Sequence, residues 1–167
     1  MEGSLTIVGY MGSGKTTLGR LLARALGLAF VDLDRAVVNS AAKEIPEIFA
    51  ECGEKRFRDL EHRALVDALE DRSPSVIACG GGIVTRPDNR ALLRDVTTVF
   101  LKEDTDVLYR RTRRPGRPLR AASREEFEQR YAERLPFYTE VADIEVGVDG
   151  RPPAKVAEEV LGCLSRR

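Results

Sequence analysis

Short apolar runs recur along the chain and alternate with longer segments that have helical periodicity. The runs are rich in Val and Ile, and they occupy residues 5–8, 29–31, 76–78, 99–101 and 144–148. Short β-branched runs predict strands, and their alternation with helices predicts an α/β fold with a mostly parallel sheet. Because 167 residues fit one domain, we expect a single unit over residues 1–167.

The segment after Lys15 predicts the first helix that connects two parallel strands. Its apolar positions are spaced i, i+3, i+4 and i+7, and Gly27 then supplies a stop signal. The predicted buried face comprises Leu18, Leu21, Leu22 and Ala25.

Three later segments also carry helix signals. Residues 45–72 are charged and helix-prone but broken at residues 52–53, which predicts two helices inserted after the second strand. Ser123 followed by Glu126 has the spacing of a capping box and predicts a helix start. Pro153 predicts the start of the last helix. The apolar side of that helix comprises Val156, Val160 and Leu164.

The composition narrows the chemistry that the chain can perform. Lys plus Arg and Asp plus Glu each number 27, so no excess of positive charge favours nucleic acid. We find no membrane-spanning stretch and no secretory signal, so we expect a cytoplasmic protein. The three cysteines fit neither a disulfide framework nor a zinc site, and the single histidine, His62, disfavours a histidine-based triad. The groups that remain available for chemistry are carboxylates, lysine, arginines, backbone amides and a bound cation.

The segment GYMGSGKT, which begins at Gly9, matches the phosphate-binding loop pattern G-x-x-x-x-G-K-[ST]. It follows a predicted strand and precedes a predicted helix, as the pattern requires. Gly9, Gly12 and Gly14 allow the backbone N–H groups to turn toward phosphate oxygens. Lys15 is expected to reach the β- and γ-phosphates, and the Thr16 hydroxyl to coordinate Mg²⁺.

A phosphate-binding loop by itself indicates nucleotide binding, which switch GTPases, motor ATPases and kinases share. Guanine-binding proteins carry an N/T-K-x-D signature after a later strand. Residues 101–104 read LKED and lack the first residue of that signature. A charged turn explains this segment better, so a switch GTPase is disfavoured.

Asp32 and Asp34 close the second predicted strand in the sequence VDLD. Residues two apart lie on the same side of an extended chain. A kinase needs one carboxylate to orient the attacking hydroxyl and another near the hydrated metal ion. A helix N-cap is an equally good explanation for either aspartate alone.

Arg58 lies in the sequence FRDLE, four residues after Glu54 and three before Glu61. All three side chains can therefore share one helix face. The spacing alone favours a solvent-exposed ladder of ion pairs. The functional alternative is a guanidinium that Glu61 holds in place to bind a substrate carboxylate.

Two further segments point to a ligand. Gly80, Gly81 and Gly82 follow the third predicted strand, where backbone approaching a ligand explains them better than a flexible turn does. Residues 110–122 contain six arginines, two prolines and one glycine, which predicts a mobile loop. Beside a phosphate-binding loop, we expect it to act as a lid rather than as a nucleic-acid patch.

The phosphate-binding loop and the DLD, FRDLE, GGG and RPL motifs, in this order and over nearly the whole chain, closely resemble shikimate kinase. The resemblance implies a three-layer α/β sandwich of the nucleoside-monophosphate-kinase type with a central five-stranded parallel sheet. It implies an acceptor-binding helical insert at about residues 33–61 and a lid at about residues 112–123. The implied activity is ATP-dependent phosphorylation of the 3-hydroxyl of shikimate, a step of aromatic amino-acid biosynthesis.

The resemblance also assigns roles to individual residues. For catalysis it implies Lys15, Asp34 and Arg117. For ATP binding it implies Gly12, Ser13, Gly14, Lys15, Thr16, Thr17, Arg111 and Arg117, with Arg111 stacked on adenine, and for Mg²⁺ it implies Thr16 and Asp32. For shikimate binding it implies Asp34, Arg58, Gly80, Gly81, Gly82, Arg134, Phe49, Phe57 and Glu61, with Arg58 and Arg134 clamping the carboxylate.

The lid departs from the family pattern. RPLR replaces the more usual RPLL at residues 117–120, and the interval before Arg117 is one residue shorter than is common. The adenine contact of Arg111 is the assignment that this departure affects.

We expect a monomer whose partners are ATP and shikimate, with neither nucleic acid nor membrane. Two alternatives stay open: a kinase for another small acceptor, such as gluconate or a nucleoside monophosphate, and a nucleotide-dependent switch without a phosphorylated product.

Overall fold

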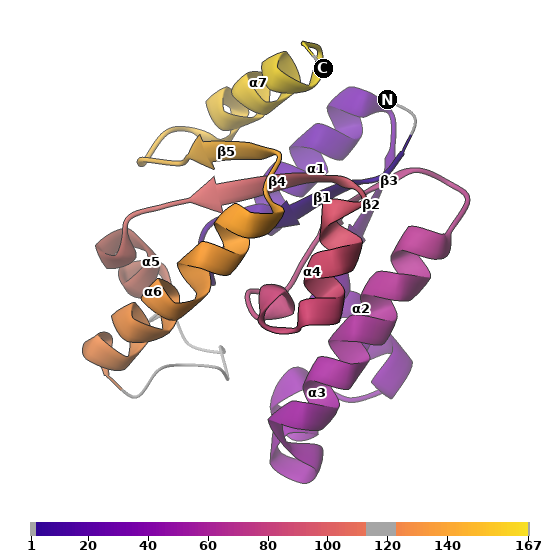
Figure 1. Ribbon diagram of the computed structural model, residues 1–167, viewed down its shortest axis with the longest axis vertical. Helices are drawn as coiled ribbons and strands as arrows, with labels where there is room; N and C mark the ends of the chain where they lie inside the picture. The colour runs from indigo at the N-terminus through magenta and orange to yellow at the C-terminus, as the bar shows by residue number, and fades with distance from the viewer. Residues whose placement is uncertain (1–2, 113–122, 167) are drawn as a thin grey trace.

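The computed structural model describes residues 3–112 and 123–166. Its centre is a five-stranded sheet with the order β2-β3-β1-β4-β5 (Figure 1). All four strand pairings are parallel, as the alternating pattern predicted. The strands are β1 (Leu5–Val8), β2 (Ala29–Asp32), β3 (Ser75–Ala78), β4 (Thr97–Lys102) and β5 (Ile144–Gly147).

One face of the sheet is covered by α1 (Lys15–Leu26) and α7 (Pro153–Leu164). Their buried apolar side chains pack on alternate residues of the strands, which is the geometry expected when successive side chains point to opposite faces. From β1, this face receives Leu5 and Ile7.

The opposite face is covered by the end of α3 (Ile45–Glu70) together with α4 (Pro87–Arg94), α5 (Thr105–Thr112) and α6 (Arg124–Val141). Its core is rich in aromatic side chains, and Phe100 of β4 stacks on Tyr138 of α6 with ring centroids 5.1 Å apart. The result is the predicted three-layer sandwich, with helices on both faces of one sheet.

The predicted stop of the first helix is confirmed, but its predicted buried face is partly wrong. Gly27 has a left-handed backbone conformation (φ 68°) and ends α1. Leu18 and Leu22 are buried, whereas Ala25 is exposed. Gly19 and Ala23 are buried as well. Gly19 packs against Phe30, and the nearest atom of that ring is 2.5 Å from the position of an added Cβ.

A helical insert follows β2, as predicted, and projects away from the sheet (Figure 1). It comprises α2 (Leu33–Ala41) and α3, which pack on each other around a small separate cluster formed by Val37, Ile48 and Phe57. The predicted break is a kink inside α3, where Gly53 has a φ of 73°. Only a residue without a side chain adopts this conformation readily, so the kink is fixed by the sequence.

The predicted loop begins too early. Residues 110–112 are the last turn of α5, and Thr112 is buried. Residues 113–122, which include most of the predicted lid and Arg117, lie outside the described residues. The chain is described again at Ser123, whose hydroxyl accepts a hydrogen bond from the N–H of Glu126 and caps α6 as predicted.

The last helix starts at Pro153, as predicted, and Val156 and Val160 are buried on the sheet. A short 3₁₀ helix, η1 (Ile83–Thr85), follows the three glycines after β3. Among the described residues, no helix combines the length and the apolar character that crossing a membrane requires.

The close packing of α1 on Phe30 generates a stability prediction. Replacing Gly19 with Ala should lower the free energy of unfolding by about 1 kcal/mol, because the added methyl group must displace the Phe30 ring. Ala is the better helix former, so helix propensity alone predicts the opposite sign. Urea-induced unfolding measures the difference.

The matched control is Gly162→Ala in α7, where the nearest atom to an added Cβ is Arg166 Nη1 at 3.7 Å. This variant should raise the free energy of unfolding by about 0.5–1 kcal/mol. Equal stabilisation by both substitutions would contradict the packing argument.

Candidate active site

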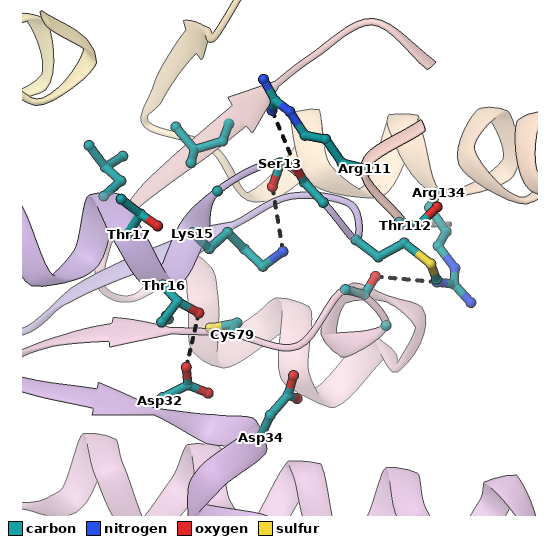
Figure 2. Close-up of a pocket in the computed structure, with 18 of the residues that line it drawn as sticks. Ser13, Lys15, Thr16, Thr17, Asp32, Asp34, Cys79, Arg111, Thr112 and Arg134 are labelled. Atoms are coloured by element: carbon teal, nitrogen blue, oxygen red, sulfur yellow. Dashed lines mark hydrogen bonds between the residues drawn. The ribbon is translucent and has the colours of Figure 1, made fainter. Parts of the chain in front are cut away.

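A cavity of about 880 Å³ opens at the carboxyl ends of the parallel strands. The loop after β1, the start of α2 and the turn after β3 all contribute to its wall. Ligands bind at this edge of open α/β sheets because the loops that leave neighbouring strands diverge there. Figure 2 shows the side chains that converge on the cavity.

The phosphate-binding loop forms one wall of the cavity. Gly12 and Gly14 have φ values of 86° and 96°, which side-chain-bearing residues rarely adopt. An added Cβ at Gly12 would lie 3.2 Å from the carbonyl oxygen of Leu108, so α5 also requires a glycine there. The N-cap of α1 is Gly14, and the first turn of α1 carries no acidic residue. The positive end of the helix dipole is therefore directed at the cavity, where it favours an anion.

Lys15 folds over this loop. Its Nζ donates to the carbonyl oxygen of Tyr10 at 2.9 Å. It also donates to Oγ of Ser13 at 3.5 Å (Figure 2). Ser13 is buried, whereas Thr17 lies further along the cavity wall. The ammonium group is thus held at the cavity by groups of the loop itself.

Asp32 caps α2 and also contacts the phosphate-binding loop. Its Oδ2 accepts a hydrogen bond from Thr16 Oγ1 at 3.0 Å, and its Oδ1 accepts from the N–H of Arg35 at 3.4 Å as the N-cap of α2. Asp34 lies in the first turn of α2 and lines the same cavity (Figure 2). The strand end therefore presents both carboxylates to the phosphate-binding loop.

The Thr16 hydroxyl and the Asp32 carboxylate fit a magnesium ion that also binds phosphates and water. Both are oxygen ligands, and Mg²⁺ typically uses one or two carboxylates with substrate phosphates and waters. Within residues 3–112 and 123–166, no cluster of three or more His, Cys, Asp or Glu side chains could hold a metal ion by itself. The donor set suits a metal that arrives with a nucleotide.

Arg58 is held by two carboxylates. Its Nη2 and Nε donate to Oε1 of Glu54 at 2.9 and 3.3 Å, and its Nη1 pairs with Oε2 of Glu61. The guanidinium lies so close to Gly82 that an added Cβ would overlap it. The side chain of Arg58 is only 12% exposed, so this group is more than a surface ion-pair ladder.

Glu61 is buried beside Gly80, where its carboxylate approaches that of Asp34. An added Cβ at Gly80 would overlap Oε1 of Glu61 and would lie 2.9 Å from Oδ1 of Asp34. Burial raises the pKa of Glu61 to about 7, although the Arg58 guanidinium opposes this shift. Burial disfavours charge on Arg58, but its contacts with Glu61 and Glu54 outweigh burial and raise its pKa.

Arg134 reaches the cavity from α6. Its Nη1 donates to the carbonyl oxygen of Gly81 at 3.3 Å, and its guanidinium lies over the Tyr10 ring, 5.6 Å from the centroid. The hydroxyl of Tyr138 donates to the same Gly81 oxygen. Arg58 and Arg134, which are far apart in the sequence, therefore line one cavity together with the phosphate-binding loop.

Arg111 lines the cavity beside the phosphate-binding loop. Its Nη1 donates to the carbonyl oxygen of Gly12 at 3.3 Å and lies 3.2 Å from Oε2 of the buried Glu103. In this position the guanidinium pairs with a carboxylate and contacts the loop backbone (Figure 2).

Not all of the expected acceptor residues line the cavity. Phe57, Gly81 and Gly82 do, whereas Phe49 and Gly80 do not. Phe49 packs on Phe57 with ring centroids 4.7 Å apart, and so supports the wall from behind. Ile45 lines the cavity although no sequence signal singled it out.

Sequence reasoning also missed the far end of the cavity. Its wall there comes from the turn after β5 and from α7. No motif marks these residues, because an apolar strand end and a helix-starting proline also occur where no ligand binds. They are Val148, Arg151, Pro153 and Val156.

Comparisons with known proteins agree with this geometry. The sequence model of a family described as shikimate kinase matches residues 11–165. A shikimate kinase from Gloeobacter violaceus is 43% identical over 168 residues, covering 98% of this chain and 93% of the relative.

Solved structures give the same result. A shikimate kinase from Acinetobacter baumannii in complex with shikimate has a TM-score of 0.93 and 31% identity, covering 98% of this chain and 93% of that one. A gluconokinase from Sinorhizobium meliloti has a TM-score of 0.62 and 23% identity over 99% of this chain and 93% of that one, which shows a shared fold alone. The family model and the relatives agree over nearly the full length of the chain, and the cavity fits them. This chain therefore belongs to the shikimate kinase family.

Proposed function

We propose that the chain phosphorylates the 3-hydroxyl of shikimate by holding ATP and shikimate in the two halves of the cavity described above. Shikimate kinase activity, the transfer of a phosphoryl group from ATP to shikimate in aromatic biosynthesis, follows from the family. One observation supports the assignment of residues: Arg58 and Arg134 line the same cavity as the phosphate-binding loop.

On the donor side, we assign the phosphates of ATP to the loop backbone, the N-terminus of α1 and Lys15. The glycine conformations and the direction of the helix dipole support this assignment. The remaining contacts would come from Ser13, Thr16 and Thr17. The adenine base would reach the far end of the cavity, between Arg111 and the wall that includes Pro153.

Thr16 and Asp32 would hold the magnesium ion that accompanies ATP. When bound, Mg²⁺ supplies positive charge that offsets the charge developing on the transferred phosphoryl group. The protein contributes two oxygen atoms 3.0 Å apart, and Asp32 is kept in place by the backbone of α2.

On the acceptor side, we assign the carboxylate of shikimate to the guanidinium groups of Arg58 and Arg134. Planar guanidinium groups bind carboxylates through paired, charge-assisted hydrogen bonds. The A. baumannii relative was solved in complex with shikimate, which supports the same ligand here. Phe57 and Gly82 would line the pocket, and residues 33–61 would form the acceptor-binding region.

Asp34 would orient the attacking hydroxyl group. Its carboxylate lies near Glu61 at the end of β2 and faces the phosphate-binding loop. The hydroxyl oxygen would form a bond to the γ-phosphorus, its proton would pass to Asp34, and the bond to the β–γ bridging oxygen would break to release ADP. Lys15 would stabilise the charge that develops on the transferred group. Arg117, which lies outside the described residues, is proposed for the same task.

Glu61 would act on Arg58 rather than on the substrate. It is buried, pairs with Nη1 of Arg58 and leaves the other edge of the guanidinium to Glu54 and the cavity. A fixed guanidinium loses less conformational entropy when it binds a carboxylate than a free side chain does.

A panel of acceptors tests the proposed function. Release of ADP should be stimulated strongly by shikimate and weakly, if at all, by gluconate or a nucleoside monophosphate. A nucleotide-dependent switch would bind ATP but would show no acceptor-stimulated turnover, so the same assay distinguishes both alternatives.

Replacing Arg58 with Ala should raise the KM for shikimate by about 10- to 100-fold, because charge-assisted hydrogen bonds to the carboxylate are lost. The Kd of ATP, measured by calorimetry, should remain within about twofold. Arg63→Ala is the matched control because Arg63 lies on the same helix with a side chain that is 75% exposed. An unchanged KM in the Arg58 variant would argue against the clamp.

Replacing Thr16 with Val should raise the Mg²⁺ concentration needed for half-maximal activity by about tenfold or more, since the hydroxyl ligand is lost. Thr16→Ser keeps the hydroxyl group and should remain near the wild type. A titration of Mg²⁺ at saturating ATP gives both values. Equal Mg²⁺ requirements for the two variants would remove Thr16 from the metal site.

Glu61→Gln tests the protonation of the buried carboxyl group. The folded-state pKa of about 7 lies above the ordinary value of 4.5, so the folded state binds the proton more tightly. The contribution of this tighter proton binding to the free energy of unfolding is fully present below pH 4.5, and it is lost as the pH rises through 7. Relative to Glu61→Gln, the wild type should therefore lose up to about 3 kcal/mol of unfolding free energy over this range. Denaturant titrations at several pH values measure it.

The control is Glu54→Gln, which removes the exposed partner of Arg58. Its unfolding free energy should change with pH as that of the wild type does. A pH dependence unaltered by Glu61→Gln would mean that Glu61 is ionised in the folded protein throughout this range.

A further inference from the structure

The face of α3 next to Arg58 and Glu61 is linked by side-chain hydrogen bonds to α4 and to the residue before it. His62 Nδ1 lies 2.6 Å from Oδ1 of Asn89, and Asp59 Oδ1 accepts a hydrogen bond from Arg86 Nη1 at 2.5 Å. None of these four residues lines the cavity or has a role in the function proposed above. We call His62, Asn89, Asp59 and Arg86 the α3–α4 clasp.

Asn89 is the buried centre of the clasp. It is 1% exposed, and its Nδ2 donates to the carbonyl oxygen of Ile83 at 2.9 Å. Its Oδ1 is therefore the acceptor in the contact with His62, so Nδ1 of His62 must carry a hydrogen. Through this amide, a side chain of α3 is joined to the backbone of the turn that follows β3.

Arg86 forms the second link. It donates to Asp59 of α3, and its Nε and Nη2 donate to the two carboxylate oxygens of Asp88 at 3.0 and 2.7 Å. The bidentate pair fixes the plane of the guanidinium group. The Arg86 hydrogen bond is the main cause that lowers the pKa of Asp88 to about 2, so this carboxylate stays charged above that pH.

The turn that the clasp holds is the same turn that contacts Arg58. Its backbone closes on itself, with Ile83 N–H donating to the Gly80 oxygen at 3.1 Å and Thr85 Oγ1 donating to the Gly82 oxygen at 2.7 Å. Gly82 leaves no space between its Cα and the Arg58 guanidinium. The turn therefore forms part of the surface against which the guanidinium lies.

The clasp adds polar links to a part of α3 that otherwise packs through Phe57 and Leu60 in the small separate cluster. The first half of α3 packs with α2 in the small separate cluster, and Gly53 kinks the helix just before Arg58. Ala64 and Leu65, within about one turn after Glu61, are the first α3 side chains that pack on the core at the sheet. Asp59 and His62 lie between the kink and that anchor.

We propose that His62 and Asp59 are positioning residues for shikimate binding, which act through Asn89 and Arg86 to hold α3, and with it Arg58, against the turn after β3. This inference rests on the proposed role of Arg58 in binding the shikimate carboxylate. It assigns a function to the single histidine of the chain.

Replacing His62 with Leu tests the proposal because it removes the Nδ1 donor and leaves Oδ1 of Asn89 without it. The KM for shikimate should rise about fivefold to tenfold, which corresponds to a partly buried hydrogen bond of about 1 kcal/mol. The KM for ATP and kcat should each stay within about twofold. His62→Asn keeps an N–H donor close to the position of Nδ1 and should restore most of the affinity for shikimate.

Asp59→Asn tests the second link independently and should raise the KM for shikimate by about twofold to fivefold, since this pair is partly exposed. It also keeps the proposal testable if the His62→Leu protein does not fold. Asp67→Asn is the matched control because it breaks the exposed pair with Arg63 on the same helix. In the control variant, every kinetic constant should stay within about 1.5-fold of its wild-type value.

A double-mutant cycle with Arg58→Ala decides whether His62 acts through Arg58. In the Arg58→Ala background, His62→Leu should change the KM for shikimate by less than twofold. The full effect in that background, or equal effects of Leu and Asn at position 62, would overturn the proposal. If Arg58→Ala alone left the KM unchanged, the proposed clamp and this inference would both fail, whereas a raised KM in Arg58→Ala with an unchanged KM in His62→Leu would overturn this inference alone.

Discussion

The site depends on a buried ion pair packed against glycine backbone. Arg58 and Glu61 pair on one face of α3, the guanidinium lies against Gly82, and the carboxylate lies against Gly80. A buried charge is costly unless it is paired, so removing either partner would leave the other uncompensated. This constraint explains why glycines are required in the turn after β3: any side chain there would occupy the space of the charged groups.

Gly81 connects the acceptor side with the donor side. Its carbonyl oxygen accepts hydrogen bonds from Arg134 and Tyr138 of α6. An added Cβ on Gly81 would lie 3.2 Å from the backbone nitrogen of Met11 in the phosphate-binding loop. The turn against which Arg58 lies therefore contacts both α6 and the phosphate-binding loop.

The parallel sheet makes this arrangement possible. The carboxyl ends of β1, β2 and β3 lie side by side, so the phosphate-binding loop, Asp32 and the glycine turn meet at one edge although long helices separate them in the sequence. The hydrogen bond from Thr16 to Asp32 joins the first helix to the second strand at that edge. The helix α3, in contrast, projects beyond the sheet, and its side chains also hydrogen-bond to Asn89 of α4 and to Arg86 just before α4.

The sequence by itself determined the features that depend on neighbouring residues. The five strands, the glycine-rich phosphate loop, the kink at Gly53 and the cap at Ser123 follow from local backbone preferences and short-range hydrogen bonds. The family resemblance, rather than any local pattern, grouped Arg134 with Arg58 and the glycine turn. Only the tertiary structure decided the other distant contacts: Asn89 against His62, and the wall near Pro153. The physical reason is that helix and strand periodicity fixes which face a residue occupies, whereas the packing of separate elements fixes what that face contacts.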